Sequence, residues 1–427
     1  MMRFRAANII NLLIGCTIVL AMIVWPSRAA EQIDMVDIPG ELAANNNIVF
    51  TADGSKGLVA VYTEKGGEAG HSVHSFDTQT GKLLSKLDTF PAGISPTRLS
   101  LAANNVLVVA ARATVNDEAA FLIVPVRANG SFDLDKQVSL AISVPIREDE
   151  QTLPDEVGLS ADGKFGIYSN KAAVFVFATA TGQILTHQEI IPASQFAANN
   201  RIESLTYDPV SNRLGLVHQQ SGSYRLIIYS LTLDGQLNLE GQVNLLKREV
   251  IGIGSNLAFN TTGTQLYVAS SNTGVVSAYD IVSGAAVFRR QVTGLAEADK
   301  DVARLSPIKL HYSAKSTRLF IQKPGHIQKP GHGKRKGRLA VINLQTAAVH
   351  STFSFETALR GAAFSEDGRI AYTLFESELQ TFDIETGEMN GKQPIVPGTL
   401  NLTLHDRKQE GLLGLVSKDI VQLVKVK

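Results

Sequence analysis

The chain has 427 residues, of which 44% are hydrophobic and 19% are charged, and its formal net charge is zero. This composition is typical of a chain that folds around a hydrophobic core, and it excludes an intrinsically disordered protein. The length suits two or three average domains or one large array of repeats.

The N-terminal segment has the pattern of a secretory signal peptide. Two arginines precede an apolar run from Ile9 to Trp25, and Ser27-Arg28-Ala29 fits a small-residue cleavage site. We expect residues 1–29 to be removed and residues 30–427 to act in the periplasm or outside a bacterial cell, with no transmembrane helix. One alternative is that the apolar run stays as an uncleaved anchor, because its length is near the lower limit for crossing a bilayer.

Cleavage would remove Cys16, the only cysteine of the chain, and Trp25, the only tryptophan. The sequence "LIGC" around Cys16 leaves a lipid anchor open as a further alternative. Without Cys16 the mature chain has no disulfide, no thiolate nucleophile, no Cys metal ligand and no CxxCH motif for covalent haem. We therefore expect no bound cofactor and no metal on this chain.

The rest of the sequence repeats itself. Segments such as "VGLSADGKFGIYSN" and "LAFNTTGTQLYVAS" combine an apolar alternation, a short polar turn and a second alternation. Eight copies are found, at spacings of 51, 58, 49, 51, 53, 52 and 43 residues. Aligned on their turns, the copies place these residues at equivalent positions: Asp53, Asn104, Asp162, Ser211, Thr262, Lys315, Asp367 and Glu410.

A second turn follows in several copies, as in "FDTQTGKLL" and "FDIETGEMN". Its Thr-Gly pair after a polar residue is typical of a hairpin, because Gly tolerates a positive φ. Each copy therefore predicts four short strands a, b, c and d, with a variable loop between b and c. Four antiparallel strands in a unit of about 50 residues predict an all-β protein, a single β-propeller. The period-2 alternation excludes a helical solenoid.

The first copy contains the long b–c connection "TEKGGEAGHSVHSF". Glu64, Glu68, His71 and His74 are residue types that bind metals. His71 and His74, however, are three residues apart at the start of a strand, so their side chains should face opposite sides. We therefore expect a solvated, Gly-rich loop at Thr63–Phe76.

The sixth copy contains the other long b–c connection, "QKPGHIQKPGHGKRKGR". It lies in an acid-free stretch from Val302 to Phe355 that holds ten basic residues, whereas residues 30–427 have 37 basic and 40 acidic residues. Such a loop concentrates anions through its electric field. The candidate anion- or partner-binding residues are Lys323, His326, Lys329, His332, Lys334, Arg335, Lys336 and Arg338. The alternative is a solvated insertion without a specific role.

The last copy supplies three strands, in "LTLHDRKQEGLLGLVSKDIVQLVKVK". The N-terminal "EQIDMVDIP" is a spare strand that can complete this copy and close the ring, which removes exposed strand edges. We therefore expect eight four-stranded blades within residues 30–427. A seven-bladed ring is the alternative.

The repeats resemble the YVTN family of β-propeller repeats, which is similar in shape to WD-repeat propellers and to the propeller chain of quinoprotein amine dehydrogenases. Segments that carry the resemblance are "VGLSADGKFGIYSN" with "VFVFATATG", and "NLAFNTTGTQLYVASSNTGVVSAYDIVSG". The resemblance spans about residues 45–427. It implies the fold, and it says little about function.

The sequence favours a non-enzymatic binding or scaffold propeller that holds a partner on its rim loops, with the basic loop at 321–338 as one contact surface. The expected partner is another protein or an anionic envelope polymer. Nucleic acid is not expected, because export removes the chain from it and no aromatic residue alternates with the cations. Two alternatives remain: a lactonase-like hydrolase that acts at the channel mouth, as the resemblance allows, and a propeller subunit of an envelope redox complex.

Overall fold

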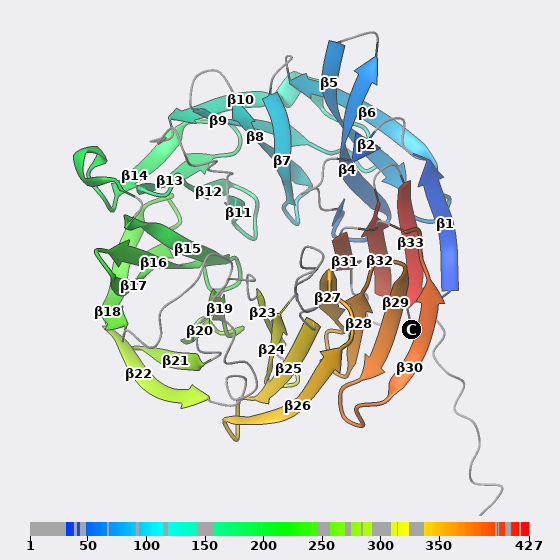
Figure 1. Cartoon of the computed structure of the whole chain (residues 1–427). Coiled ribbons are helices and arrows are strands. Elements are labelled where there is room, and N and C mark those ends of the chain that lie inside the picture. The colour runs from blue at the N-terminus through cyan, green and yellow to red at the C-terminus, as the bar shows by residue number, and fades with distance from the viewer. Residues whose placement is uncertain are drawn as a thin grey trace, which may run out of the picture.

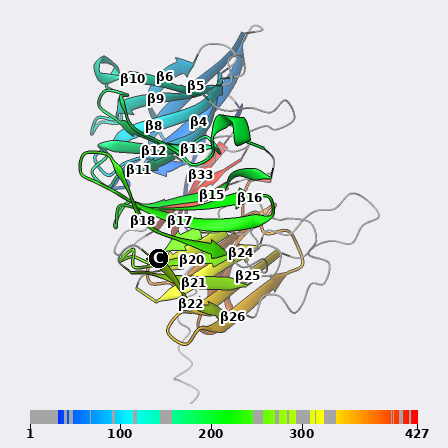
Figure 2. The same ribbon diagram turned by 90° about the vertical axis from the view of Figure 1, so that its left-hand side faces the viewer.

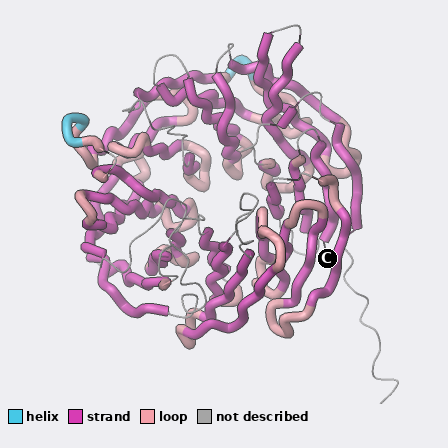
Figure 3. Tube along the Cα trace, viewed as in Figure 1, coloured by secondary structure: helices cyan, strands magenta, loops and turns pink. Residues whose placement is uncertain are grey.

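Eight antiparallel sheets stand around a common axis as the blades of a β-propeller (Figure 1). The computed structural model of the chain describes residues 31–37, 41–42, 48–65, 68–90, 94–113, 118–143, 157–197, 199–245, 257–269, 275–282, 285–292, 309–313, 315–323, 337–397, 399, 401–405, 411–417 and 420–426. The helices among these residues are two single 3₁₀ turns at the rim (Figure 3), η1 (Leu134–Lys136) and η2 (Ala193–Gln195). The predicted all-β propeller with eight blades is confirmed. The expected signal peptide lies outside the described residues.

Each blade runs from an innermost to an outermost strand. Blade 1 comprises β2 (Glu41–Leu42), β3 (Val49–Phe50), β4 (Lys56–Lys65), β5 (Glu68–Asp77) and β6 (Leu83–Phe90), and blade 2 comprises β7 (Ile94–Leu101), β8 (Val106–Ala113), β9 (Glu118–Pro125) and β10 (Val138–Ser143). Blade 3 comprises β11 (Val157–Leu159), β12 (Phe165–Ser169), β13 (Ala173–Ala178) and β14 (Ile184–Glu189), and blade 4 comprises β15 (Asn200–Asp208), β16 (Arg213–Gln220), β17 (Ser223–Leu231) and β18 (Leu237–Leu245). Blade 5 comprises β19 (Leu257–Phe259), β20 (Gln265–Ala269), β21 (Val276–Val282) and β22 (Ala285–Val292), and blade 6 comprises β23 (Lys309–Ser313), β24 (Arg318–Lys323), β25 (Gly337–Asn343) and β26 (Ala348–Phe355). Blade 7 comprises β27 (Gly361–Phe364), β28 (Ile370–Leu374), β29 (Glu378–Asp383) and β30 (Met389–Pro394), and blade 8 comprises β31 (Asn401–His405), β32 (Gly411–Val416), β33 (Ile420–Val426) and β1 (Glu31–Asp37).

The N-terminal strand closes the ring, as predicted. The outermost strand of blade 8 is β1, which pairs antiparallel with β33 from Glu31–Lys425 to Asp37–Ile420. Val36 is 0% exposed and packs among apolar residues of blades 8 and 1, whereas its neighbour Met35 is 54% exposed. One face of β1 therefore joins the core, and the other faces solvent.

The core consists of eight hydrophobic clusters, and each cluster lies in one seam between neighbouring blades. Alternate residues along an inner strand point into opposite seams. In β24, for example, Leu319 and Ile321 pack toward blade 5, and Phe320 packs toward blade 7. Burial on both faces explains why the central strands have apolar residues at nearly every position.

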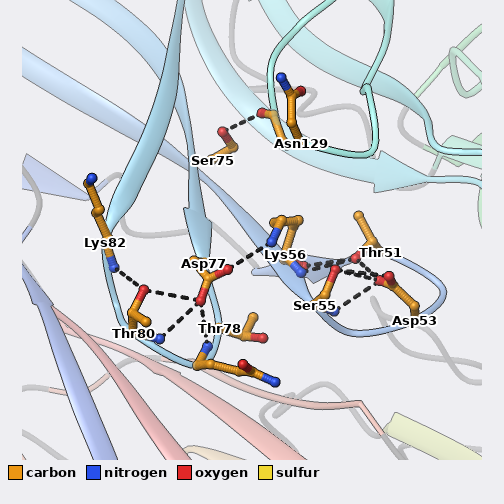
Figure 4. A network of polar contacts seen from close by, with 12 residues as sticks. Thr51, Asp53, Ser55, Lys56, Ser75, Asp77, Thr78, Thr80, Lys82 and Asn129 are labelled. Carbon is orange, nitrogen blue, oxygen red and sulfur yellow. Dashed lines mark hydrogen bonds and ion pairs between the residues drawn. The ribbon is translucent and has the colours of Figure 1, made fainter.

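The turns that join a to b and c to d meet on one face of the ring, here called the turn face. Figure 4 shows its blade 1 part, where the Asp77 carboxylate accepts hydrogen bonds from the backbone N–H groups of Gln79 and Thr80. The same carboxylate pairs with Lys56 at 2.7 Å. The Lys56 ammonium lowers the pKa of Asp77 to about 2. Here the "DxxTG" pattern is a turn capped by its own carboxylate, as expected from the sequence.

Neighbouring blades also contact each other across the turn face. The Asn104 amide donates to the Asp162 carbonyl at 2.6 Å, and a Cβ on Gly163 would lie 2.1 Å from the Asn104 side chain. Gly163 has a φ of 68°, so both its conformation and its close contact require glycine. In blade 6, Arg318 donates to the Gly368 carbonyl of blade 7 at 3.1 Å and pairs with Glu385. The regular turns therefore bind each blade to the next.

We predict that Val36→Asp lowers the free energy of unfolding by about 3 kcal/mol or more, because it buries a carboxylate in the closing seam. Met35→Asp, the matched control on the solvent side of β1, should change it by less than about 0.5 kcal/mol. Urea unfolding of residues 30–427 measures both. Equal effects would show that β1 does not close the ring in solution.

We also predict that Arg318→Met costs about 1–3 kcal/mol, because it leaves the Gly368 carbonyl and Glu385 without their cation. The control is Lys315→Met, which removes an exposed pair with Glu366 in the same seam. Its expected cost is below about 1 kcal/mol. A control that costs as much as Arg318→Met would contradict the role of Arg318.

Candidate functional site

The connections from b to c and from d to the next a meet on the opposite face of the ring, here called the loop face; 220–223 and 355–361 are examples. Figure 2 shows the ring from the side, with the blades stacked one above another. The predicted basic loop belongs to the loop face, because it joins β24 to β25. Lys323 and Arg338 lie directly opposite each other in these paired strands. The other candidates, His326, Lys329, His332, Lys334, Arg335 and Lys336, lie outside the described residues.

Blade 6 also carries a polar group beside the channel. His311 is on the innermost strand β23, and its ring lies 5.3 Å from the ring of Phe364 in blade 7. Gln322 on β24 is 1% exposed and lies opposite Lys309 in the register. Among the described residues, the Gln322 amide nitrogen and the His311 Nε2 have no hydrogen-bond partner.

The environment of His311 keeps its imidazole neutral. Burial, with a smaller contribution from the charge of Lys309, lowers the pKa of His311 to about 4, although a hydrogen bond with Gln322 opposes both effects. At neutral pH the ring therefore has one N–H donor and one acceptor nitrogen.

Blade 4 has a second polar group near the channel. The Glu203 side chain is 8% exposed and accepts a hydrogen bond from Arg201 Nε at 3.1 Å. On the other face of the blade, His218 Nε2 lies 2.9 Å from the Asn200 amide oxygen, and both side chains are buried. Burial lowers the pKa of His218. Arg201 and Glu203 neutralise each other, so this group presents no unbalanced charge.

The expected solvated loop at Thr63–Phe76 is wrong. Strand β4 continues to Lys65 and β5 begins at Glu68, so most of this segment is a hairpin. The alternating apolar residues of β5 continue a blade strand through His71 and His74, which are both buried. Ser72 Oγ lies 3.0 Å from His74 Nε2, but Ser72 is 1% exposed, so this pair has no access to a substrate.

The described part of the chain holds no candidate metal centre. Within it, no three or more His, Cys, Asp or Glu side chains form a group that could hold a metal ion. Nor does that part contain a helix with the length and hydropathy needed to cross a membrane.

The sequence prediction missed His311, Gln322, Arg201 and Glu203. None belongs to a linear motif, because the residues of each group come from different positions of a blade. A signal for the blade 6 pair was available in the repeats themselves. In the sixth copy, His311 and Gln322 are large polar residues at positions where the other copies have small or apolar residues.

Comparisons with known proteins support the fold. No protein-family description matches the chain, and neither does any curated protein. Among solved structures, Sqt1 from Chaetomium thermophilum, bound to the N-terminus of ribosomal protein L10, is similar with a TM-score of 0.61 and 13% identity over 91% of this chain and 99% of that one. A protein from Lactobacillus plantarum is similar with a TM-score of 0.52 and 14% identity, over 80% of this chain and 97% of that one. Raptor from Chaetomium thermophilum has a TM-score of 0.53 and 11% identity, over 94% of this chain and 29% of that one.

The chain has a WD40-like β-propeller fold. At identities of 11% to 14%, the comparisons establish the fold alone.

We predict that the protein loses stability on mild acidification. Burial lowers the pKa values of His71, His74, His218 and His311 below the ordinary value of 6.5. Above pH 6.5 both the folded and the unfolded chain keep these rings neutral. As the pH falls from 6.5 toward 4, the unfolded chain takes up protons that the folded chain does not. Stability should therefore fall, by up to about 1.4 kcal/mol per pH unit for His311.

Urea unfolding at about pH 7.5 and about pH 4.5 measures this loss. The variant His311→Phe keeps an aromatic ring beside Phe364 and removes one titrating group, so its stability should depend less on pH. The same pH dependence in the variant and the wild type would contradict the assignment to His311.

Proposed function

We propose that this chain is a non-enzymatic binding propeller that holds an acidic partner on its loop face. The partner would be a protein or an anionic envelope polymer, and the basic loop at 321–338 would be a main contact surface. The observation that carries this proposal is the register of β24 and β25. It sets Lys323 and Arg338 side by side at the base of a connection whose sequence holds further cations and no acid.

Electrostatics support this assignment. Cations gathered in one connection concentrate anions locally, although residues 30–427 have 37 basic and 40 acidic residues in all, and the effect weakens with salt. The described carboxylates of the turn face, by contrast, accept hydrogen bonds from their own turns, as Asp77, Asp162 and Asp383 do. The basic connection has no acidic residue in its own sequence.

The fold also supports a binding role. In the Sqt1 structure, a propeller of similar shape is bound to the N-terminus of another protein, ribosomal protein L10. We infer a comparable protein-binding role here. Export to the periplasm or beyond, and membership of the YVTN repeat family, are parts of the same proposal and rest on the sequence patterns alone.

No specific observation favours the hydrolase alternative. The Ser72–His74 pair has the distance of a nucleophile and its base, but it lies inside the seam between blades 8 and 1. Binding is therefore the function that the described residues support best.

We predict that replacing residues 324–337 by Asn-Gly abolishes binding of an acidic probe. Because Lys323 and Arg338 are directly paired, a two-residue turn can join them without shifting the register. The probe is a fluorescein-labelled hexaglutamate peptide, and its fluorescence anisotropy reports binding. Wild-type binding should weaken about tenfold or more between about 50 and about 300 mM salt.

The control variant neutralises three exposed cations of the turn face, Lys82→Gln, Lys164→Gln and Arg369→Gln. It removes charge without touching the loop face, so its affinity for the probe should stay within about twofold of the wild type. If the loop replacement binds hexaglutamate as well as the wild type does, the basic loop is not the contact surface.

A further inference from the structure

The outermost strand of blade 2, β10, differs from the outermost strands of the other seven blades. In β1, β6, β14, β18, β22, β26 and β30 the pairing register shifts at a β-bulge. All of these strands except β26 also contain at least one charged residue. Strand β10, by contrast, pairs with β9 without a shift from Val138–Ile123 to Ser143–Glu118, and its sequence VSLAIS has no charge and no proline.

This difference leaves the edge of blade 2 open. Bulges, charges and prolines are the features by which proteins prevent an exposed strand edge from pairing with another chain. Strand β10 has none of the three, and it lies on the convex outer rim of the ring (Figure 1). Among the described strands, none pairs with its outer side. A further strand could therefore be added there.

The hydrogen bonds of the β9–β10 hairpin show which backbone groups of β10 point inward. The Pro125 carbonyl at the end of β9 accepts a hydrogen bond from the Asp133 N–H, in the segment leading to β10, at 2.9 Å. The backbone groups of successive residues in a strand point to alternate sides, so those of Ile123, two residues earlier, also face β10. Val138 lies opposite Ile123 and therefore bonds to it.

The backbone groups of Ser139, Ala141 and Ser143 consequently point away from β9. These residues alternate with Val138 along the strand, so their N–H and C=O groups lie on the open side. The contact from blade 3 agrees with this direction, because the Asn170 Nδ2 donates to the Ser143 carbonyl at 3.0 Å. The N–H and C=O groups of Ser139 and Ala141 thus form the row that an added strand would meet.

The side chains beside this edge leave room on one face and offer apolar surface on the other. Ser139 and Ala141 are small and exposed. On the face toward blade 3, Val138 packs against the hydrophobic cluster between blades 2 and 3. A Cβ on Gly182 of blade 3 would lie 2.7 Å from Val138 Cγ1, so the turn before Ile184 touches β10. Ile184 is 40% exposed and adds apolar surface there.

These features specify the occupant. We propose that β10 receives an extended segment of another protein as a fifth strand of blade 2, with apolar residues at alternate positions facing blade 3. In this mode of recognition the backbone hydrogen bonds supply affinity, and the alternate side chains supply specificity. The surface is separate from that of the proposed function, because blade 2 lies across the ring from blade 6, which carries the basic loop (Figure 1).

A second copy of the chain fits this edge less well than an extended segment does. Two convex rims would meet along one strand of six residues, a contact about 20 Å long. A stable interface between folded proteins buries about 1,200–2,000 Å². A flexible segment needs no such area beyond the strand itself, because it can follow the edge and the apolar surface beside it.

The test uses residues 30–427 and the peptide Lys-Val-Thr-Val-Thr-Val-Lys, whose terminal lysines keep it off the basic loop. Amide hydrogen exchange followed by NMR reports on each backbone N–H separately. We expect the peptide to slow exchange at Ser139 and Ala141 about tenfold or more, because their N–H groups gain partners. Exchange at Leu140, whose N–H already bonds to β9, should stay unchanged.

A variant separates the edge from the rest of the rim. Ala141→Pro removes an outward N–H and no bond to β9, a position at which edge strands tolerate proline. It should weaken binding of the fluorescein-labelled peptide about tenfold or more, measured by fluorescence anisotropy, with a melting temperature close to that of the wild type. Ala141→Thr is the matched control, because it changes the side chain and keeps the N–H. Its affinity should stay within about twofold of the wild type.

Any of three results would overturn the proposal. Unchanged exchange at Ser139 and Ala141 in saturating peptide would show that no strand is added to β10. Equal affinity of Ala141→Pro and the wild type would place the peptide elsewhere on the protein. If sedimentation instead shows that the wild type is a dimer and Ala141→Pro a monomer, the edge joins two copies of this chain and is not a site for another protein.

Discussion

The structure depends on one constraint: a blade has two apolar faces and cannot bury either of them alone. Every hydrophobic cluster of the described core lies in a seam, and none lies within a single blade. An open array of such blades would leave one apolar face exposed at each end. Pairing β1 with β33 brings the two ends of the chain into one sheet, so that blade 8 can pack against both blade 7 and blade 1. Closure is therefore a condition for burying the core.

The same constraint separates the two faces of the ring. On the turn face, each blade must fit its neighbour closely, as the contact between Asn104 and Gly163 shows. Carboxylates there accept hydrogen bonds from backbone N–H groups of their own turns, which fixes their positions. Such turns tolerate little change, and they recur with similar sequences. The loop face has no equivalent requirement, so its connections differ in length and charge and can carry a function.

This difference explains what could be predicted from the sequence. Strands, turns, the number of blades and the closing strand follow from local patterns that the chain repeats eight times, so their signals reinforce one another. The segment at 63–76 was mistaken for a loop because its glycines and charges suggested one, although its alternation continued through His71 and His74. The polar groups around Glu203 and His311 could not be predicted from a motif, because cross-strand pairing, not sequence adjacency, brings their members together.

The repeats nevertheless supply the reference that a single sequence otherwise lacks. Eight blades bury equivalent positions, so a position that the other seven fill with small or apolar residues shows what packing alone requires. Gln322 departs from that requirement at a buried site, where an amide nitrogen without a hydrogen-bond partner is destabilising. Ala362 departs in the opposite way, because it is smaller than the apolar residue that each of the other blades has at the equivalent position. Neither change improves packing, and the two face each other across one seam, Gln322 on blade 6 and Ala362 on blade 7. Packing alone therefore explains why seven blades avoid a large polar side chain at this position, and it does not explain why blade 6 has one.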